Sequence, residues 1–381
     1  MDKKRIIIVG PAYPYRGGIA DFNERLAREF QCEGHEVLTY TFTLQYPSFL
    51  FPGTTQYSTS PAPKDLNIIR KVNSINPFNW LKVGREIRRQ CPDMVMIRFW
   101  LPFLAPCLGT IARVIRRNKH IRVVGLLDNV IPHEHRIGDK LFARYMIKSL
   151  EGYVAMSESV LKDARDFDDS LPYGLTPHPL YDNFGDKVSR EEAIKKLELD
   201  ADTRYILFFG LIRDYKGLDL LLRAFADKRL RGKKVKLIVA GEFYSNAEIY
   251  EHLESELELA EHIVWFKEFV PADKVRYLFA AADIVAQPYK TATQSGITQI
   301  AYHFERPMLV TSVGGLAEIV PHGKVGYVVA PDASEIADAL VDFVDHRTEA
   351  DYRDGILEEK AKYAWSNMTA QLLGVAEKSK Q

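Results

Sequence analysis

Three loops rich in glycine or hydroxyl side chains each follow an apolar run and precede a helical pattern. They span residues 10–18 (GPAYPYRGG), 209–217 (FGLIRDYKG) and 287–299 (QPYKTATQSGITQ). Glycines allow backbone N–H groups to approach a ligand closely, and the N-terminus of a helix favours an anion. The chemistry that these loops offer is therefore the binding of phosphate groups.

The second loop adds two cations, Arg213 and Lys216, three positions apart after Gly210. Arginine offers a bidentate fork and lysine a point charge, and together they suit a diphosphate. In a parallel sheet such a loop lies at the carboxyl edge, where ligands bind. The alternative is that both cations are solvated loop residues.

In the other two loops, phosphate binding would depend on backbone groups rather than on charged side chains. In the first, Gly17 and Gly18 precede a helix, and the alternative is a tight turn that needs glycine. It matches neither G-x-G-x-x-G nor G-x-x-x-x-G-K-[ST], which disfavours a nicotinamide site. In the third, the amides of Ser295, Gly296 and Ile297 are expected to form a nest for phosphate. A fourth strand-to-helix junction, TSVGGLAE, spans residues 311–318.

Apolar runs alternate with helical patterns, which predicts parallel α/β sheets. The predicted strands are 5–10, 36–42, 94–99, 123–127, 153–156, 205–209, 235–240, 263–266, 284–287, 308–311 and 326–329. The order strand, glycine, loop, helix starts again near residue 200. We therefore predict two doubly wound domains, 1–180 and 181–355, joined by a linker at 176–186. Residues 356–381 form a last helix, in which Trp365 and Leu372 need packing partners.

Two local features complete this prediction. A helix at 21–32 has Asp21 and Glu24 at capping-box spacing and Gly34 as its terminator. Residues 43–80 contain many prolines and aromatics and are expected to be irregular. They form either an ordered loop that touches an acceptor substrate or a packed surface insertion.

Composition excludes several classes of protein. The chain has 381 residues with 51 Lys+Arg and 51 Asp+Glu, so its formal net charge is zero and nucleic acid is not an expected partner. Three dispersed cysteines without a CxxC motif indicate reduced thiols, with no disulfide frame or zinc site. The apolar run near the N-terminus is too short for a signal peptide, and no run is long enough to span a bilayer. A cytoplasmic location is expected.

The chain resembles the retaining GT-B glycosyltransferases of family 4, known as glycosyl transferases group 1. The motifs that carry the resemblance are PxxPxxGGIAdF, FFGLIRDYKGLDLLLRAF and SGITQIAYHFERPMLVTSVGGLAEIVPHGKVGYVVAP. The resemblance implies two Rossmann-like domains facing across a cleft, with a final helix that crosses back to the N-terminal domain. The N-terminal domain would hold a glycan or lipid-linked glycan acceptor, and the C-terminal domain a nucleotide-diphosphate sugar donor.

The resemblance also implies roles for individual residues. Gly17 and Gly18 would lie beside the donor diphosphate, and Lys216 matches the lysine that neutralises the leaving phosphate. The family arginine directly follows the glycine; here Leu211 stands there, and Arg213 is the nearest arginine. Asp128 stands where a histidine often faces the sugar. The nearest alternatives to it are His133, Glu134 and the linker residue His178.

The glutamates of the family's EX7E motif have no counterpart here. Their positions fall on Thr293 or Gln294 and on Gln299 or Ala301, where glutamine or threonine is left to bond sugar and ribose hydroxyls. The predicted catalytic residues are Lys216, Arg213, Asp128 and His133. The predicted donor-binding residues are Gly17, Gly18, Gly210, Gln294, Ser295, Gly296, Ile297, Thr298 and Gln299.

The expected reaction is retaining sugar transfer, driven by electrostatic stabilisation of the departing diphosphate. Neither a metal nor a cofactor besides the donor is expected. The alternatives are an epimerase-type enzyme and a non-catalytic protein that binds sugar nucleotides. One group of basic residues accompanies the apolar stretch 103–115 and another lies on the helix 81–90. They predict contact with an anionic membrane at the inner face, the alternative being solvated helix faces. They are Lys82, Arg85, Arg88, Arg89, Arg113, Arg116, Arg117, Lys119 and Arg122.

Overall fold

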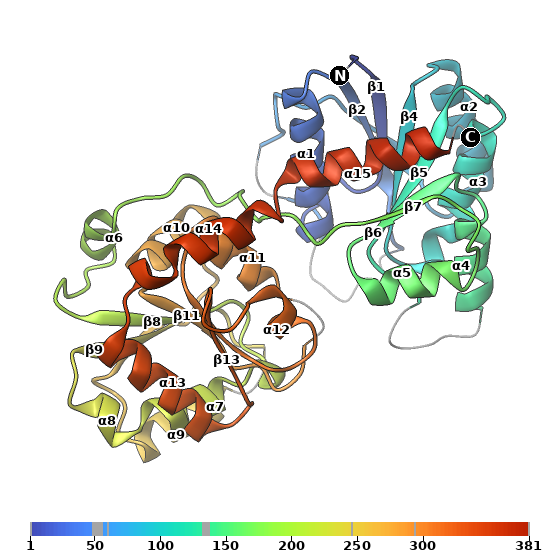
Figure 1. Cartoon of the computed structure of the whole chain (residues 1–381). Helices are drawn as coiled ribbons and strands as arrows, with labels where there is room; N and C mark the ends of the chain where they lie inside the picture. The colour runs from blue at the N-terminus through green and yellow to red at the C-terminus, as the bar shows by residue number, and fades with distance from the viewer. Residues whose placement is uncertain are drawn as a thin grey trace. The chain divides into compact units, whose positions relative to one another are not determined.

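The structure is a computed structural model that describes residues 2–47, 56–58, 61–131, 138–244, 247–292 and 295–379. It divides into two compact units (Figure 1). Unit 1 consists of Met1–His178 and Ala364–Gln381, and unit 2 of Pro179–Tyr363. Residues 356–363, which were predicted to belong to the last helix, therefore lie in unit 2.

Unit 1 is built on a parallel sheet with the strand order β3-β2-β1-β4-β5-β6-β7. The strands are β1 Arg5–Val9, β2 Glu36–Leu44, β3 Ile68–Asn73, β4 Met94–Phe99, β5 Arg122–Leu127, β6 Gly152–Ala155 and β7 Tyr173–Leu175. The helices are α1 Gly18–Cys32, α2 Pro77–Arg89, the short η2 Pro102–Leu104, α3 Ala105–Ile115, α4 Asp139–Ile147, α5 Glu158–Arg165 and α15 Trp365–Lys378.

Unit 2 has a parallel sheet with the order β10-β9-β8-β11-β12-β13. Its strands are β8 Arg204–Phe209, β9 Val235–Ala240, β10 Ile263–Phe266, β11 Ile284–Gln287, β12 Met308–Thr311 and β13 Gly326–Val329. Its helices are α6 Arg190–Lys196, η3 Asp214–Lys216, α7 Leu218–Phe225, α8 Lys228–Arg231, α9 Ala247–Glu256, α10 Ala272–Ala281, α11 Gly296–His303, α12 Leu316–Ile319, α13 Ala333–His346, η4 Glu349–Tyr352 and α14 Arg353–Ala361.

The inner strands of each sheet are buried on both faces, which is why they appear in the sequence as continuous apolar runs rather than alternating ones. In β1, Ile6, Ile7, Ile8 and Val9 are all fully buried. Ile7 and Val9 belong to one hydrophobic cluster, and Ile6 and Ile8 belong to another. Successive side chains of a strand point to opposite faces, so helices must cover both sides of the sheet.

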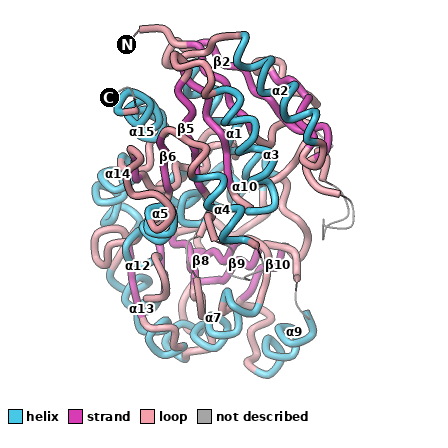
Figure 2. The backbone as a smooth tube through the Cα atoms, turned by 90° about the vertical axis from the view of Figure 1, so that its right-hand side faces the viewer, coloured by secondary structure: helices cyan, strands magenta, loops and turns pink. Residues whose placement is uncertain are grey.

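The last helix covers one face of the unit 1 sheet, as predicted. Helix α15 packs against β5, β6 and β7; Figure 2 shows it next to β5 and β6. The Trp365 ring lies 4.8 Å from the ring of Phe22, and Leu372 is fully buried among residues of β1, β4 and β5. The two apolar side chains that needed partners thus find them in unit 1.

Two predictions about local structure were wrong. Residues 43–80 are not irregular throughout, because they contain β3 and the start of α2. Asn76 caps α2, accepting hydrogen bonds from the amides of Phe78 and Asn79, and Pro77 occupies the first helical turn. The predicted capping pair Asp21 and Glu24 does not start α1, because Gly17 is the N-cap and Glu24 instead accepts the amide of Tyr13 at 2.8 Å.

The termination of α1 was predicted correctly. Gly34 has φ +89°, and the amides of Gly34 and His35 donate to the carbonyls of Gln31 and Phe30. This is the Schellman arrangement, which requires a residue that tolerates positive φ. Among the described residues, no helix is both long and apolar enough to cross a membrane.

Candidate functional site

Two of the predicted phosphate loops lie side by side in unit 2. The chain passes from β8 to β9 and β10 on one side, and β11 to β13 lie on the other, so the strand order reverses between β8 and β11. Loops that leave the carboxyl ends of such neighbours diverge and form a ligand crevice. Residues 210–217 follow β8, and residues 288–295 follow β11.

The close approach of these loops depends on a glycine. Gly217 has φ +67°, and a Cβ built on it would lie 1.9 Å from the carbonyl oxygen of Pro288. Any other residue would therefore clash with backbone that cannot move aside. Gly210, with φ +97°, lies on the inner side of the same loop, where its Cβ would be 3.1 Å from Lys216 Nζ and 3.2 Å from Ile297 Cδ1.

Lys216 is a buried cation that forms no ion pair with any residue that the structure describes. Only 8% of the residue is exposed, and its Nζ lies 5.8 Å from the centre of the Tyr289 ring. Burial, and secondly the charge of Arg213, lower the pKa of Lys216 to about 8. Within the described chain no carboxylate counteracts this shift. A buried charge is stable only when it is paired, so this position favours an anionic ligand.

Lys290 explains why Lys216 has no carboxylate partner. Asp214 and Asp219 flank Lys216 in the sequence, and both are paired with Lys290, at 2.9 and 3.0 Å from its Nζ. The amide of Lys290 also donates to the carbonyl of Tyr215 at 2.7 Å. Lys290 thus neutralises Asp214 in the β8–α7 loop and Asp219 in the first turn of α7, and joins that loop to the β11–α11 loop.

Arg213 lies at the start of η3 with its side chain exposed. Its guanidinium lies over the Tyr244 ring, 5.1 Å from the ring centre. Arg213 is close enough for its charge to lower the pKa of Lys216. The structure therefore brings together the two cations that the sequence singled out, one buried and one at the surface.

The N-terminus of α11 differs in detail from the predicted nest. Ser295 is the N-cap, and its Oγ accepts the amide of Ile297 at 3.2 Å, so that amide is already occupied. The hydroxyl of Tyr289 forms a hydrogen bond with the N-cap side chain, 3.1 Å from Ser295 Oγ. Gly296 packs against Tyr181, whose ring lies 3.0 Å from the position of a Cβ. Ile297 contributes its side chain, beside Gly210, rather than a free amide.

Two buried glutamines lie near this end of β11. Thr298 Oγ1 donates to Gln287 Oε1 at 3.1 Å, so the hydroxyl of Thr298 is turned toward the strand. Gln287 Nε2 and Gln299 Oε1 are buried and have no hydrogen-bond partner among the described residues. Gln287 was not predicted from the sequence, because a polar residue at a strand end gives no distinctive signal. Thr293, Gln294, His133 and Glu134 lie outside the described residues.

In unit 1, strand order reverses between β1 and β4, and the loop after β1 carries Gly17 and Gly18. Gly17 has φ +109°, and a Cβ there would meet no atom within 4 Å. The backbone conformation therefore favours glycine at this position, and no described atom fills the space where a side chain would begin. Asn23 Nδ2 holds the loop by donating to the carbonyl of Pro11 at 2.9 Å.

Asp128 forms an ion pair with a buried arginine. Arg98 on β4 is 1% exposed, and its Nε and Nη2 donate to the two carboxylate oxygens of Asp128. The guanidinium also lies 3.9 Å from the centre of the Phe22 ring. Removing one partner of a buried pair typically costs about 3–5 kcal/mol. Asp128 therefore holds Arg98 in place. The other candidate in this unit, His178, packs edge-on against Phe22, with 5.0 Å between the ring centres.

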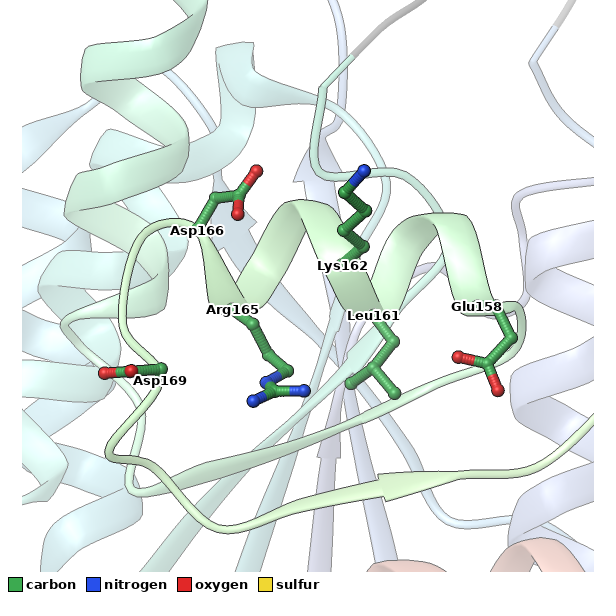
Figure 3. Close-up of a pocket in the computed structure, with 6 residues that line it drawn as sticks. All are labelled: Glu158, Leu161, Lys162, Arg165, Asp166 and Asp169. Carbon is green, nitrogen blue, oxygen red and sulfur yellow. The ribbon is translucent and has the colours of Figure 1, made fainter.

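A separate hollow on helix α5 does not contain any predicted site residue. It has a volume of about 290 Å³ and is lined by Leu161 and by charged residues (Figure 3). These are Glu158, Lys162, Arg165, Asp166 and Asp169. It combines three acids with two bases, so it presents no buried cation comparable with Lys216. Within the described ranges, no three His, Cys, Asp or Glu residues are grouped so that they could hold a metal ion.

Comparison with known proteins agrees with this geometry. Residues 203–346 match the family model described as Glycosyl transferases group 1. The D-inositol 3-phosphate glycosyltransferase 2 of Catenulispora acidiphila is 30% identical over 208 residues, 51% of this chain and 47% of that protein. The uncharacterized glycosyltransferase MJ1607 of Methanocaldococcus jannaschii is 29% identical over 203 residues, 50% of each. The chain spans about half the length of these curated relatives.

Solved structures show the same fold over the whole chain. A glycosyltransferase from Rickettsia africae has a TM-score of 0.71 at 16% identity, covering 100% of this chain and 99% of that one. Anabaena HepE, in complex with UDP and glucose, has a TM-score of 0.68 at 15% identity, covering 98% and 100%. The two-domain α/β fold, GT-B, is thereby confirmed, and the sequence match to the group 1 glycosyltransferase model lies within unit 2, at residues 203–346.

The lowered pKa of Lys216 predicts how diphosphate binding depends on pH. Lys216 is charged below about pH 8 and loses its proton above it. The affinity for UDP or ADP should therefore fall above pH 8, approaching tenfold per pH unit. Isothermal titration between about pH 7.5 and 9.5 measures this fall. In Lys216→Arg, which stays charged, the affinity should be flat over the range; a wild-type profile that is equally flat would contradict the assignment.

The pairing of Lys290 predicts a rescue experiment. Lys290→Met releases the carboxylates of Asp214 and Asp219 next to Lys216, and affinity for a nucleoside diphosphate should fall by about tenfold through repulsion. The triple variant Lys290→Met, Asp214→Asn, Asp219→Asn removes those charges and should recover most of the loss. If the triple variant binds as weakly as Lys290→Met alone, Lys290 acts only by joining the loops.

Proposed function

We propose that this chain is a glycosyltransferase that moves a sugar from a nucleotide-diphosphate sugar to a glycan or lipid-linked glycan acceptor, with retention of anomeric configuration. The observation that carries the proposal is the buried, unpaired Lys216 between two loops at the strand-order reversal of unit 2. The group 1 match covers these loops. The UDP in the HepE structure makes UDP-sugars the first donors to test.

The proposed chemistry needs positive charge where the diphosphate leaves. The bond between the sugar C1 and the phosphate oxygen breaks, the acceptor oxygen bonds to C1 on the same face, and the departing phosphate takes the acceptor proton. Lys216 stabilises the leaving phosphate, and Arg213 adds a second cation at the rim. Because protein cations supply this charge, we propose that transfer is independent of a metal ion and needs no cofactor.

A second candidate is a sugar-nucleotide binding protein without transferase activity, or one of the epimerase type. The observation that favours it is the absence of glutamate at the EX7E positions, where Gln299 is buried and Ala301 has no polar group. Turnover distinguishes the candidates. A transferase releases nucleoside diphosphate faster when acceptor is added, an epimerase alters the sugar without an acceptor, and a binding protein does neither.

A thermal-shift panel tests the donor site first. UDP, GDP, ADP and their common sugars are each added to the full chain, with and without Mg²⁺. A ligand at about 100 times its Kd stabilises the folded state by about 2.7 kcal/mol, which gives a measurable rise in Tm. We expect one nucleotide to stabilise the protein, and the shift to shrink in Lys216→Ala. No shift with any nucleotide would contradict both the transferase and the binding protein.

We further propose that unit 1 contacts an anionic membrane at the inner, cytoplasmic face. Helix α2 buries Val83, Gly84 and Ile87 and presents the opposite face to solvent. On that exposed face lie Phe78, Lys82, Arg85 and Arg89, spaced as successive turns. Phe78 is 84% exposed. A large apolar side chain at the end of a row of cations suits insertion beside acidic headgroups.

Vesicle co-sedimentation tests this contact. The full chain should sediment with phosphatidylglycerol vesicles and remain in solution with phosphatidylcholine vesicles, since each basic residue near the surface contributes about 1 kcal/mol. Phe78→Ser with Arg85→Gln should reduce binding by tenfold or more. A matched control, Lys195→Gln with Lys196→Gln on α6 of unit 2, should leave it unchanged. Equal sedimentation with both vesicle types would contradict an electrostatic contact.

A further inference from the structure

Unit 1 contains a hollow that none of the roles above uses. It lies between the β1–α1 loop, the segment that precedes β3, and the first residues of β3, and it has a volume of about 470 Å³. This is within the range of small-molecule sites, about 300–1,000 Å³. Its lining includes Tyr13, Pro14, Pro63, Leu66, Ile68 and Arg70.

The walls of this hollow are held in place by backbone contacts. Tyr15 and Tyr57 form an antiparallel bridge, and the amide of Ser58 donates to the carbonyl of Pro14 at 2.8 Å. The amide of Tyr13 donates to Glu24 Oε1 at 2.8 Å. Prolines 14 and 63 have fixed φ angles. A wall that is ordered before a ligand arrives reduces the entropy cost of binding.

Arg70 supplies an uncompensated positive charge at the edge of the hollow. Its Nε donates to the carbonyl of Phe42 at 3.0 Å, and its Nη2 donates to the Tyr57 hydroxyl at 3.2 Å. The guanidinium lies over the rings of Tyr15 and Tyr57, 5.9 and 5.4 Å from their centres. None of its hydrogen-bond or ring partners in the described part of the chain is negatively charged, since burial raises the pKa of Tyr15 to about 12.

The nearby acids do not compensate this charge. Asp65, on the segment that precedes β3, is paired with Arg28 at 2.6 Å. Glu24 accepts a hydrogen bond from the amide of Tyr13, which lies on the β1–α1 loop. Lys64, next to Asp65, is exposed and adds positive charge to the same segment. The hollow therefore combines an apolar and aromatic lining with a fixed cation.

We propose that this hollow binds an anionic sugar unit of the acceptor, one that carries a carboxylate or a phosphate. The apolar lining suits the C–H faces of a sugar ring, and Arg70 suits the anion because its planar fork matches carboxylate and phosphate geometry. Tyr13 and Pro14 lie on the loop that carries Gly17 and Gly18, beside which the donor diphosphate is expected. The proposal rests on the proposed transferase function and specifies its acceptor.

Saturation-transfer NMR on the full chain tests the proposal with three probes. Methyl β-glucuronide carries a carboxylate, glucose 6-phosphate a phosphate, and methyl β-glucoside no charge. At least one anionic probe should bind about tenfold more tightly than the neutral probe, as expected for charge-assisted hydrogen bonds at a partly exposed site. The stronger of the two anionic probes identifies the source of the charge.

Two variants and a control locate the binding. Arg70→Gln should remove the preference for the anion, and Leu66→Trp, which fills the hollow without altering Arg70, should weaken the binding of all three probes. Lys64→Gln removes an exposed cation from the same segment and should leave the preference unchanged. An equal loss in Lys64→Gln and Arg70→Gln, or no preference in the wild type, would overturn the proposal.

Nucleotide binding separates this proposal from the donor site. The nucleotide-induced rise in Tm depends on unit 2 and should persist in the Arg70 and Leu66 variants, which also shows that they fold. Nucleotide binding without preference for an anionic probe would overturn the acceptor proposal alone. Preference for an anionic probe without any nucleotide binding would overturn the donor site and leave the anion-binding hollow.

Discussion

The parallel direction of neighbouring strands is the constraint on which the other features depend. In a parallel sheet every strand ends at the same edge, so the loops that leave those ends gather there. β8 pairs in parallel with both β9 and β11, and its chain continues on one side while β11 to β13 lie on the other. This reversal allows the loops that carry Lys216 and Lys290 to meet.

Arg98 and Lys216, both buried in the described part of the chain, differ in whether a carboxylate pairs with them. Arg98 in unit 1 has a carboxylate partner, Asp128, at the end of the neighbouring strand β5. Lys216 in unit 2 has none, although Asp214 and Asp219 are near in sequence, because Lys290 occupies both. A paired buried charge supports structure, whereas an unpaired one is balanced only by a ligand.

Much of the fold was predictable because strands buried on both faces leave continuous apolar runs. The predicted bounds of β4, β9, β10 and β11 agree with the structure at both ends. The edge strands β3 and β7 were missed, since β3 contains exposed Arg70 and Lys71 and β7 has only three residues. The start of α1 was misplaced because Asp21 and Glu24 have capping-box spacing, while Gly17 provides the actual N-cap.

The site was predictable where it depends on residue type in a loop, and not where it depends on contacts between loops. Gly210, Arg213 and Lys216 stand in one short segment, so their spacing alone predicts a phosphate loop, and the structure places Gly210 and Arg213 close to Lys216. The pairing of Lys290 joins side chains 76 and 71 positions apart, and no local pattern indicates it. The pairing of Asp128 with Arg98 was equally unpredictable from the sequence, since Arg98 lies on an otherwise apolar strand.

The resemblance places Gln299 at one of the positions of the EX7E glutamates. A glutamine there has a physical consequence other than the loss of a carboxylate. A buried carboxylate without a partner would be very costly, whereas an unpaired amide oxygen costs roughly 1–3 kcal/mol. Gln299 Oε1 is such an atom, buried and unpaired in the described part of the chain. An amide keeps an acceptor for a hydroxyl group while adding no negative charge. The glutamine is therefore compatible with the proposed donor site, to which Lys216 and Arg213 contribute positive charge.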